Sequence, residues 1–386
     1  MELSEILYHY GEDRDLYFNA MSPPVIQTSN FVFKDIADLK TKMGDEFNHH
    51  VYSRGNNPTV EILRKKIAAL EGTEECLVVG SGATATAAAI IGNVQAGDHV
   101  ICVQKPYSWT QKLISKFLTR FGVNYDFVDA REIDEIAQRI QPNTKVLMLE
   151  SPNTLTFEVQ DLKACAQLAQ KHGIVTVIDN SHCSPLYQNP ASFGIDLVIH
   201  TATKYINGHS DVVMGMICGS EAMIRKIFYS EFMTLGLNVS PHDAALALRG
   251  LRTLPMRLER SSRNAEKLVD FISSHDKVRK IYFPFHKDNP QLELAKSQMR
   301  GAGGLFSFEL DTDNKERVNH FVDALDKFLL AVSWGGYESL KMPTLAFYDF
   351  PGQPDPPLPF QLVRLYAGLE DEDYLLTNLD KALKVV

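Results

Sequence analysis

The stretch Leu197-Val198-Ile199-His200-Thr201-Ala202-Thr203-Lys204-Tyr205 is an apolar run that stops at two hydroxyl residues and a lysine. The apolar run predicts a buried strand. A lysine at the end of a buried strand is costly to place without a partner or a covalent role. Lys204 is therefore a candidate amine nucleophile.

Thr201 and Thr203 lie three and one positions before Lys204, so their hydroxyl groups can gather beside the amine. This suits an aldehyde cofactor that also carries a phosphate, and pyridoxal phosphate (PLP) is the obvious example. A lone Thr-x-Thr-Lys motif more often marks a strand end with a solvated lysine. A catalytic role therefore needs support from the rest of the chain.

The stretch Gly173-Ile174-Val175-Thr176-Val177-Ile178-Asp179-Asn180 predicts a second buried strand, which ends in an acid. Buried parallel strands bind ligands at their carboxyl ends. Asp179 precedes Lys204 by 25 residues, enough for a crossover to the next strand, so both can face one site. A carboxylate beside the PLP ring nitrogen keeps that nitrogen protonated and the cofactor an effective electron sink. The alternative is that Asp179 only closes the turn after the strand and has no part in catalysis.

A third motif, Cys76-Leu77-Val78-Val79-Gly80-Ser81-Gly82-Ala83-Thr84-Ala85-Thr86, predicts a strand, a glycine turn and the start of an alanine-rich helix. Backbone N–H groups at such a helix start bind anions, which makes Gly82 and Ala83 candidate phosphate donors. The motif has no Gly-Lys-Ser/Thr tail and no Gly-x-Gly-x-x-Gly spacing. Neither a nucleoside triphosphate nor a dinucleotide is the leading ligand.

The composition excludes several classes of function. The 386 residues suffice for a large core and two domains. The net charge of −9 and the lack of a basic run argue against nucleic acid. No apolar run approaches the ~18 residues of a membrane span, and a signal pattern is absent. Five cysteines without metal-ligand spacing predict reduced thiols, no metal site and a cytoplasmic location.

Apolar strand runs alternate with helical segments, which predicts an α/β fold with a mostly parallel sheet sandwiched by helices. The runs are Leu77–Val79, Val100–Val103, Tyr125–Val128, Val146–Leu149, Val175–Ile178, Leu197–His200 and Val213–Ile217. We predict an N-terminal arm over residues 1–50 that contacts a neighbouring subunit, and a cofactor-binding major domain over residues 51–245.

The remaining residues, 246–386, are predicted to form a smaller C-terminal α+β domain. A helical pattern runs from Ala244 to Phe271, and strands are expected at Gly303–Leu310 and Leu329–Ser333. Residues 351–359 hold five prolines, in the run Pro351-Gly352-Gln353-Pro354-Asp355-Pro356-Pro357-Leu358-Pro359. This stretch predicts a loop, because proline removes N–H donors and fixes φ.

Over almost its whole length, the chain resembles the trans-sulfuration family of fold-type I PLP-dependent enzymes, which includes cystathionine synthases, cystathionine lyases and methionine γ-lyase. The motifs that carry the resemblance are, in order, Tyr52-Ser53-Arg54-Gly55-Asn56-Asn57-Pro58-Thr59, Ser81-Gly82-Ala83, Tyr107, Glu150-Ser151-Pro152, Asp179-Asn180, Thr201-Ala202-Thr203-Lys204-Tyr205, Gly208-His209-Ser210-Asp211 and Arg364-Leu365. The family implies a PLP-dependent transferase fold.

The resemblance assigns a role to each cofactor-site candidate. Lys204 would bind the PLP aldehyde covalently, Asp179 would pair with the pyridinium nitrogen, and Tyr107 would stack on the ring. The phosphate would be held by Thr201, Thr203, Gly82 and Ala83. Taken singly, each residue also has an ordinary structural interpretation, but the shared order of the motifs favours the family role.

The resemblance also implies shared sites and a substrate. Tyr52 and Arg54 would reach the phosphate of the neighbouring subunit's cofactor, so the protein would be a homo-oligomer, a tetramer built from dimers. Arg364 would bind the α-carboxylate of an amino-acid substrate, because a guanidinium is a natural bidentate donor to that group. Ser333 would help to orient the lysine and the substrate.

The branch of the family is less clear from the sequence. One stretch is similar to the bacterial cystathionine β-lyase pattern: Ser333-Trp334-Gly335-Gly336-Tyr337-Glu338-Ser339-Leu340. A second stretch departs from the pattern of the γ-branch: Glu150-Ser151-Pro152-Asn153-Thr154-Leu155-Thr156. Tyr52-Ser53-Arg54 with Asn57-Pro58-Thr59 is instead typical of the γ-branch. Trp109, in Tyr107-Ser108-Trp109, matches neither branch well, and Tyr366 stands where a smaller residue or a histidine is more usual, which leaves the substrate size open.

Three hypotheses follow. The first is β-elimination from cystathionine or cystine-like substrates, which gives pyruvate, ammonia and a thiol. The second is γ-elimination or γ-replacement of the cystathionine γ-lyase, methionine γ-lyase or cystathionine γ-synthase type. The third is a phosphate-binding or interaction module without chemistry. In the enzymes the freed Lys204 amine would remove the Cα proton, and Tyr107 or Tyr52 would handle a proton near the sulfur.

Overall fold

The computed structural model describes residues 1–349 and 356–386, and the chain forms two compact units. The first unit comprises Met1–Ser151, Gln160–Asn207 and Asp211–Thr253; the second comprises Pro152–Val159, Gly208–Ser210 and Leu254–Val386. The predicted domain boundary at residue 245 therefore falls inside a helix of the first unit. Residues 351–355 of the predicted proline loop lie outside the described residues.

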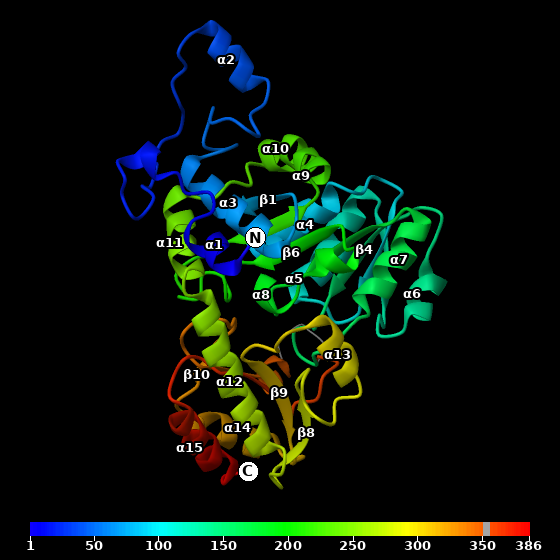
Figure 1. The fold of residues 1–386 in the computed structure, drawn as a ribbon. Coiled ribbons are helices and arrows are strands. Elements are labelled where there is room, and N and C mark those ends of the chain that lie inside the picture. Colours follow the sequence, from blue (N-terminus) through cyan, green and yellow to red (C-terminus); the bar gives the residue numbers. More distant parts are fainter. Residues whose placement is uncertain (350–355) are drawn as a thin grey trace. The chain divides into compact units, whose positions relative to one another are not determined.

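A seven-stranded sheet flanked by helices forms the first unit (Figure 1). Its strand order is β1-β7-β6-β5-β4-β2-β3; β7 is antiparallel to β1 and β6, and the other pairs are parallel. The strands are β1 Glu75–Val79, β2 His99–Val103, β3 Asn124–Val128, β4 Thr144–Glu150, β5 Val175–Asp179, β6 Leu197–Thr201 and β7 Gly215–Gly219. The predicted mostly parallel sheet is confirmed.

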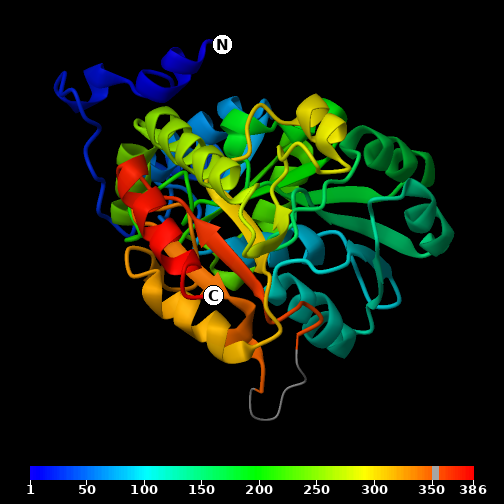
Figure 2. The ribbon, with the colours of Figure 1, turned by 90° about the horizontal axis from the view of Figure 1, so that it is seen from below.

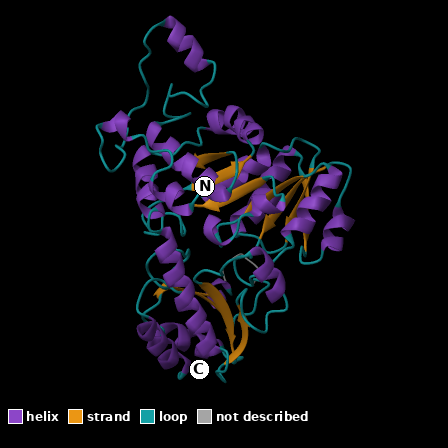
Figure 3. Cartoon of the chain, viewed as in Figure 1, coloured by secondary structure: helices purple, strands orange, loops and turns teal. Residues whose placement is uncertain are grey.

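Helices precede the sheet, connect most of its strands and follow its last strand (Figure 3). They are α1 Leu3–Tyr8, α2 Ile36–Met43, α3 Pro58–Glu71, α4 Gly82–Ile91, α5 Ser108–Lys112, α6 Ile133–Arg139, α7 Leu162–His172, α8 Ser184–Tyr187, α9 Glu221–Ile227, α10 Met233–Leu235 and α11 Pro241–Leu251. Covered strands must be apolar on both faces. All five residues of β2, for example, are buried, which explains why the central strands read as continuous apolar runs.

β7 begins two residues later than predicted because glycine packing, rather than strand propensity, defines it. A Cβ atom at Gly215 would lie 2.1 Å from the Ser81 carbonyl oxygen, and one at Gly219 would lie 2.7 Å from the Leu197 side chain. Glycine is disfavoured in strands unless another part of the chain approaches closely. The apolar pattern therefore missed the two glycines that bound this strand.

The second unit is a five-stranded sheet with α12, α14 and α15 packed together against it (Figure 2). Its order is β10-β11-β12-β9-β8. The elements are α12 Leu254–Ile272, β8 Val278–Tyr282, α13 Leu292–Gln298, β9 Leu305–Leu310, α14 Lys315–Ala324, β10 Leu329–Leu330, β11 Leu340–Pro343, β12 Leu362–Tyr366 and α15 Glu372–Leu383. The predicted strand at 329–333 ends early, and Ser333 has a left-handed φ of 85°.

The helical pattern predicted from Ala244 to Phe271 is divided between α11 and α12. Pro255 explains the division, because it lacks the N–H that would continue a helix and is tolerated in a first turn. It occupies the second position of α12. This proline was the missed signal in the sequence.

The predicted N-terminal arm is only partly anchored. Ile6 and Leu7 of α1 are buried, and the Lys66 ammonium donates hydrogen bonds to their carbonyl oxygens at 2.9 and 3.2 Å. In contrast, α2 buries no side chain and extends away from the sheet (Figure 1). Contact of the arm with a neighbouring subunit stays a prediction.

Candidate active site

Asp179 is the last residue of β5 and is buried at the carboxyl end of that strand. Its carboxylate accepts hydrogen bonds from the Ser181 N–H at 3.0 Å and from the Ser181 hydroxyl at 2.5 Å. Burial raises the pKa of Asp179, while these hydrogen bonds and the charges of His200 and Lys204 oppose the rise. A cationic ligand at this carboxylate would favour its ionised form.

Lys204 lies in the turn that follows β6. The Ser181 hydroxyl accepts a hydrogen bond from the Thr201 N–H at 2.6 Å, which ties the end of β6 to the residues after β5. The Lys204 N–H donates to the Thr201 carbonyl at 3.1 Å. The turn thus keeps the lysine, which is half-buried, close enough to Asp179 for its charge to act on that carboxyl. Asp179, Thr201 and Lys204 are brought together.

Thr203 braces the same turn. Its hydroxyl accepts a hydrogen bond from the Met214 N–H at 3.0 Å and lies 3.3 Å from the Met214 carbonyl oxygen. These contacts connect the lysine turn to the residues just before β7. A hydroxyl that accepts from Met214 keeps one hydrogen, which it can donate to the Met214 carbonyl or to a ligand.

The start of α4 lies against Thr201. A Cβ atom at Gly82 would lie 2.0 Å from Thr201 Oγ1, so only glycine permits this approach. Ser81 caps the helix by accepting a hydrogen bond from the Thr84 N–H at 3.0 Å. Within the described chain, no acceptor is found for the N–H groups of Gly82 and Ala83. The helix start therefore offers two donors to an anion beside a threonine hydroxyl.

Tyr107 follows β2 and precedes α5. Its N–H donates to the buried carboxylate of Glu150, the last residue of β4, at 2.7 Å. The ring is 43% exposed and thus accessible to a ligand. Burial and the negative charges of Asp179 and Glu150 raise the pKa of Tyr107, so the phenol is protonated at neutral pH.

Tyr52 and Arg54 lie just before α3. The Arg54 guanidinium lies 5.4 Å from the Tyr52 ring centroid, and both side chains are exposed. Among the described residues, no carboxylate pairs with Arg54. The contacts of these two side chains are with each other rather than with Asp179, so the chain leaves an exposed cation beside an exposed aromatic ring.

Arg364 belongs to the second unit, where it is the middle residue of β12. The guanidinium is buried and donates to the Ser333 carbonyl at 3.2 Å and to the Thr154 hydroxyl at 3.5 Å. Burial lowers its pKa to about 10. No carboxylate of the described chain pairs with it. A buried guanidinium without a counter-ion is costly, which suits a site where a ligand supplies the anion.

Tyr366 and Trp109, whose roles the sequence left open, lie in different units of the chain. Tyr366 is almost fully buried, and its hydroxyl donates to the Gly336 carbonyl at 2.8 Å, so it packs inside the second unit. Trp109 is 56% exposed in the first unit, and the Lys112 ammonium lies 4.5 Å from its ring centroid.

Sequence reasoning missed several supporting residues. Ser181 bridges Asp179 and Thr201, and its only signal was a hydroxyl two positions after the acid. Glu150 was noted within a motif but not as the partner of Tyr107. Thr154 was likewise not assigned to Arg364. Each of these contacts joins residues from different elements, which a linear pattern does not reveal.

Gly82→Ala should damage the anion-binding helix start without unfolding the protein. The added methyl group must displace Thr201 or α4, because it would lie 2.0 Å from Thr201 Oγ1. We expect affinity for PLP to fall at least about tenfold, the effect of losing one or two hydrogen bonds to a charged group. Titration of the apoprotein with PLP measures this. Gly80→Ala is the control, because a Cβ atom there would lie 3.7 Å from the Asn238 carbonyl oxygen, an ordinary contact distance. Equal affinities of Gly82→Ala and wild type would contradict the prediction.

Comparison with known proteins identifies the class. Residues 4–384 match the family described as Cys/Met metabolism PLP-dependent enzyme. The L-methionine γ-lyase of Pseudomonas putida is 35% identical over 97% of this chain and 96% of its own length. The cystathionine β-lyase MetC of Bacillus subtilis is 37% identical over 89% of this chain and 88% of its own. The crystal structure of MetB from Corynebacterium glutamicum has a TM-score of 0.92 at 30% identity, covering 100% of this chain and 98% of that one.

The fold and these matches define a fold-type I PLP-dependent enzyme. The chain belongs to the Cys/Met metabolism family of PLP-dependent enzymes, which includes lyases of trans-sulfuration, and PLP is its cofactor. The residues fit that cofactor, since the first unit combines a buried acid, a nearby lysine and a helix start that only glycine allows. No helix among the described residues is long and apolar enough to cross a membrane.

Proposed function

We propose that the protein is a carbon-sulfur lyase that cleaves cystathionine or cystine-like amino acids by β-elimination and releases pyruvate, ammonia and a thiol. One observation above all supports an elimination site: buried Asp179 and Lys204 share the carboxyl end of the sheet with the glycine-dependent start of α4. The family membership supports the carbon-sulfur chemistry.

Several residues of the first unit would hold PLP. Asp179 would bind the ring nitrogen and Tyr107 would cover the ring, while the phosphate would be bound by the Gly82 and Ala83 N–H groups with Thr201 and Thr203. When bound, PLP supplies an electron sink that stabilises negative charge at the substrate Cα.

Two side chains of the first unit would move protons. The Lys204 amine would remove the Cα proton, since a neutral amine is an effective general base. Tyr107 would donate a proton to the departing sulfur, because its phenol is protonated at neutral pH. Tyr52 is the second candidate for this step. Its exposed ring lies beside the Arg54 cation.

Arg364 would bind the substrate α-carboxylate. It is a buried guanidinium held by the Ser333 carbonyl, with no carboxylate of the described chain as partner. Two parallel hydrogen bonds from its planar group would fix the orientation of the amino acid. Ser333 would help to orient the substrate, because its carbonyl accepts a hydrogen bond from the Arg364 guanidinium.

Complete sites would require a homo-oligomer, a tetramer built from dimers. Tyr52 and Arg54 would then bind the phosphate of the neighbouring subunit's cofactor. The arm supports this, because Phe18 and Val32 are 98% and 94% exposed and would be covered at an interface. A cytoplasmic location is also part of the proposal, and it accords with five free, buried cysteines.

γ-Elimination or γ-replacement is the second candidate, because methionine γ-lyases are among the 35% identical relatives. The keto acid that the enzyme releases distinguishes β-elimination from γ-elimination. The pure enzyme is incubated with cystathionine and the product is identified by chromatography. We expect pyruvate. 2-Oxobutyrate would replace this proposal with γ-elimination, and the Lys204→Ala variant should form neither.

A further inference from the structure

Ser181 lies two residues after Asp179, and both of its donor groups contact one atom of that acid. Its N–H donates to Asp179 Oδ1 at 3.0 Å, and its hydroxyl donates to the same Oδ1 at 2.5 Å. Within the described chain, no hydrogen bond reaches Oδ2, the second carboxylate oxygen. One oxygen of the buried acid is therefore held by the protein, and the other is available to a ligand.

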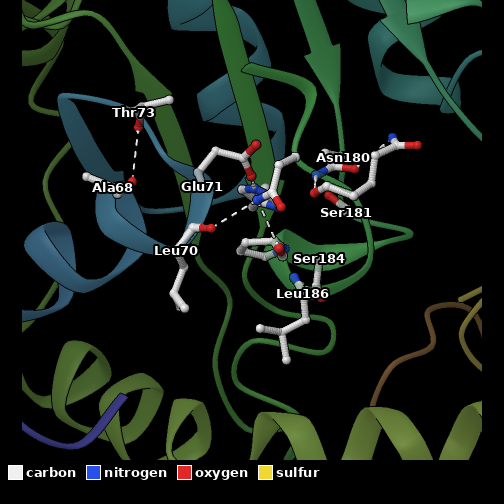
Figure 4. Close-up of polar contacts among 12 residues, drawn as sticks. Ala68, Leu70, Glu71, Thr73, Asn180, Ser181, Ser184 and Leu186 are labelled. Carbon is white, nitrogen blue, oxygen red and sulfur yellow. Dashed lines mark hydrogen bonds and ion pairs between the residues drawn. The ribbon is translucent and has the colours of Figure 1, made fainter. Parts of the chain in front are cut away.

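The neighbouring strand orients the Ser181 hydroxyl. The N–H of Thr201, the last residue of β6, donates to Ser181 Oγ at 2.6 Å. A hydroxyl group has one hydrogen, and Thr201 needs only a lone pair, so the hydrogen is left for Asp179. Figure 4 shows Ser181 beside Asn180, in the segment that follows β5. Two adjacent strands thus fix the Ser181 hydroxyl as a donor to the acid.

An ordinary turn explains only half of this arrangement. An aspartate often accepts a hydrogen bond from the N–H two residues later, and that contact closes a turn with almost any residue in the second position. Ser181 contributes a second donor, its hydroxyl, which the turn does not need. The side chain is buried, so this hydroxyl has exchanged water for Asp179 and Thr201. The second donor therefore serves the carboxylate rather than the turn.

Two donors at Oδ1 favour the ionised form of Asp179. Hydrogen bonds to a carboxylate lower its pKa, and those from Ser181 oppose the rise that burial causes. The backbone N–H is fixed, so a proton on Oδ1 would face a donor hydrogen. The proton of a neutral Asp179 would lie on Oδ2 instead, where it would block the atom that has to accept a hydrogen bond from a protonated ring nitrogen.

The titratable groups that act on Asp179 come from three other positions. Positive charge at His200 on β6 and at Lys204 in the following turn favours the ionised carboxylate. The Tyr107 phenol, after β2, has its own pKa raised by Asp179. Ser181 differs from these groups because it is neutral and in direct contact with the carboxylate. Its substitution changes the pKa of Asp179 without removing a charge from the site.

We propose that Ser181 is a positioning residue for the cofactor acid: its two donors hold the Asp179 carboxylate through Oδ1 and leave Oδ2 as the acceptor for the protonated ring nitrogen of PLP. This inference rests on the proposed binding of PLP at Asp179. Ser181 acts through Asp179, so its hydroxyl should matter for the ring nitrogen in particular and not for the cofactor as a whole.

The test compares two cofactors. Apoprotein of wild type and of Ser181→Ala is titrated with PLP, and with an analogue in which C–H replaces the ring nitrogen; binding is followed by absorbance. The analogue has no nitrogen for Oδ2, so the ratio of the two dissociation constants reports this one contact. We expect wild type to prefer PLP, and Ser181→Ala to lose about tenfold of that preference at neutral pH, the effect of one hydrogen bond to a charged group.

The same titrations across pH give a second readout. Only an ionised Asp179 binds the protonated nitrogen well, so the preference for PLP falls as the pH drops through the pKa of Asp179. Loss of the Ser181 hydroxyl raises that pKa, and in Ser181→Ala the fall should therefore begin at a higher pH. Ser181→Thr, which keeps the hydroxyl, should restore both the preference and its pH dependence.

Ser184 provides the matched control. It is a buried serine of the same segment, and its hydroxyl accepts a hydrogen bond from the Leu186 N–H at 3.3 Å rather than contacting Asp179. Figure 4 shows Ser184 beside Leu186. Ser184→Ala removes an equivalent hydroxyl, so its preference for PLP should match that of wild type.

The outcomes separate this inference from the proposed function. The inference is wrong if Ser181→Ala keeps the wild-type preference, or if it binds PLP and the analogue more weakly by the same factor. A wild-type protein that binds both compounds equally would instead refute the placement of PLP at Asp179, and with it the proposed function. If Ser181→Ala does not fold, Ser181→Cys replaces it, because a thiol is a weaker donor than a hydroxyl.

Discussion

Lys204→Ala should lower kcat with cystathionine by about 10²- to 10⁴-fold, the range expected when a general base is removed. The amine lies at the end of β6, where its charge acts on buried Asp179, and no second lysine of the proposed site can replace it. The fold should survive, because the half-buried side chain is no part of the apolar core.

Borohydride treatment followed by peptide mapping gives a second readout for this variant. Wild type should carry a pyridoxyl group on Lys204, and the variant should carry none. Lys145→Ala is the matched control: Lys145 is an exposed lysine near the amino end of β4, and its removal should change neither kcat nor labelling. An adduct on another lysine, or full activity of Lys204→Ala, would show that the nucleophile is wrongly assigned.

Arg364→Leu should lower kcat/KM by about 10²- to 10³-fold, because truncating one partner of a buried charge pair costs about 2–5 kcal/mol. The expected loss lies mainly in KM for the amino acid. The free enzyme should be as stable as wild type or more stable, since the variant removes a buried guanidinium that has no carboxylate partner in the described chain.

Steady-state kinetics and thermal unfolding of the same preparations test both halves of this prediction. Arg364→Lys should be intermediate, because it keeps the charge but loses the planar fork. Arg279→Leu, at an exposed arginine paired with Asp311 and Asp313, is the control and should leave KM unchanged. A wild-type KM in Arg364→Leu, or a large loss of stability without a kinetic effect, would contradict a carboxylate-binding role.

The sequence was most informative where burial alone defines an element. β5 and β6 are covered on both faces, so their apolar runs and the residues that end them, Asp179 and Thr201, could be read directly. The bounds of an element were predicted less accurately where close packing or a proline determines them. Gly215 in β7 is set by the approach of Ser81, and the break before α12 by Pro255.

The support of the candidate site could not be predicted because its contacts are distant in sequence. Tyr107 and Glu150 are 43 residues apart, and no periodicity relates them. The approach of Gly82 to Thr201 likewise depends on the packing of α4 against the sheet. The order of motifs in the sequence indicated which residues belong to the site. The contacts between them depend on how the backbone folds, which the sequence pattern does not show.

Helix α3 connects an exposed segment of the chain with the buried sheet. Its 14 residues make a rod about 21 Å long, with the Tyr52–Arg54 segment just before one end and Glu71 at the other. Glu71 is buried against His200 of β6, so a movement of the helix along its axis would break this contact. The exposed Tyr52–Arg54 segment, which lies just before the helix, is therefore held at a fixed distance from the sheet.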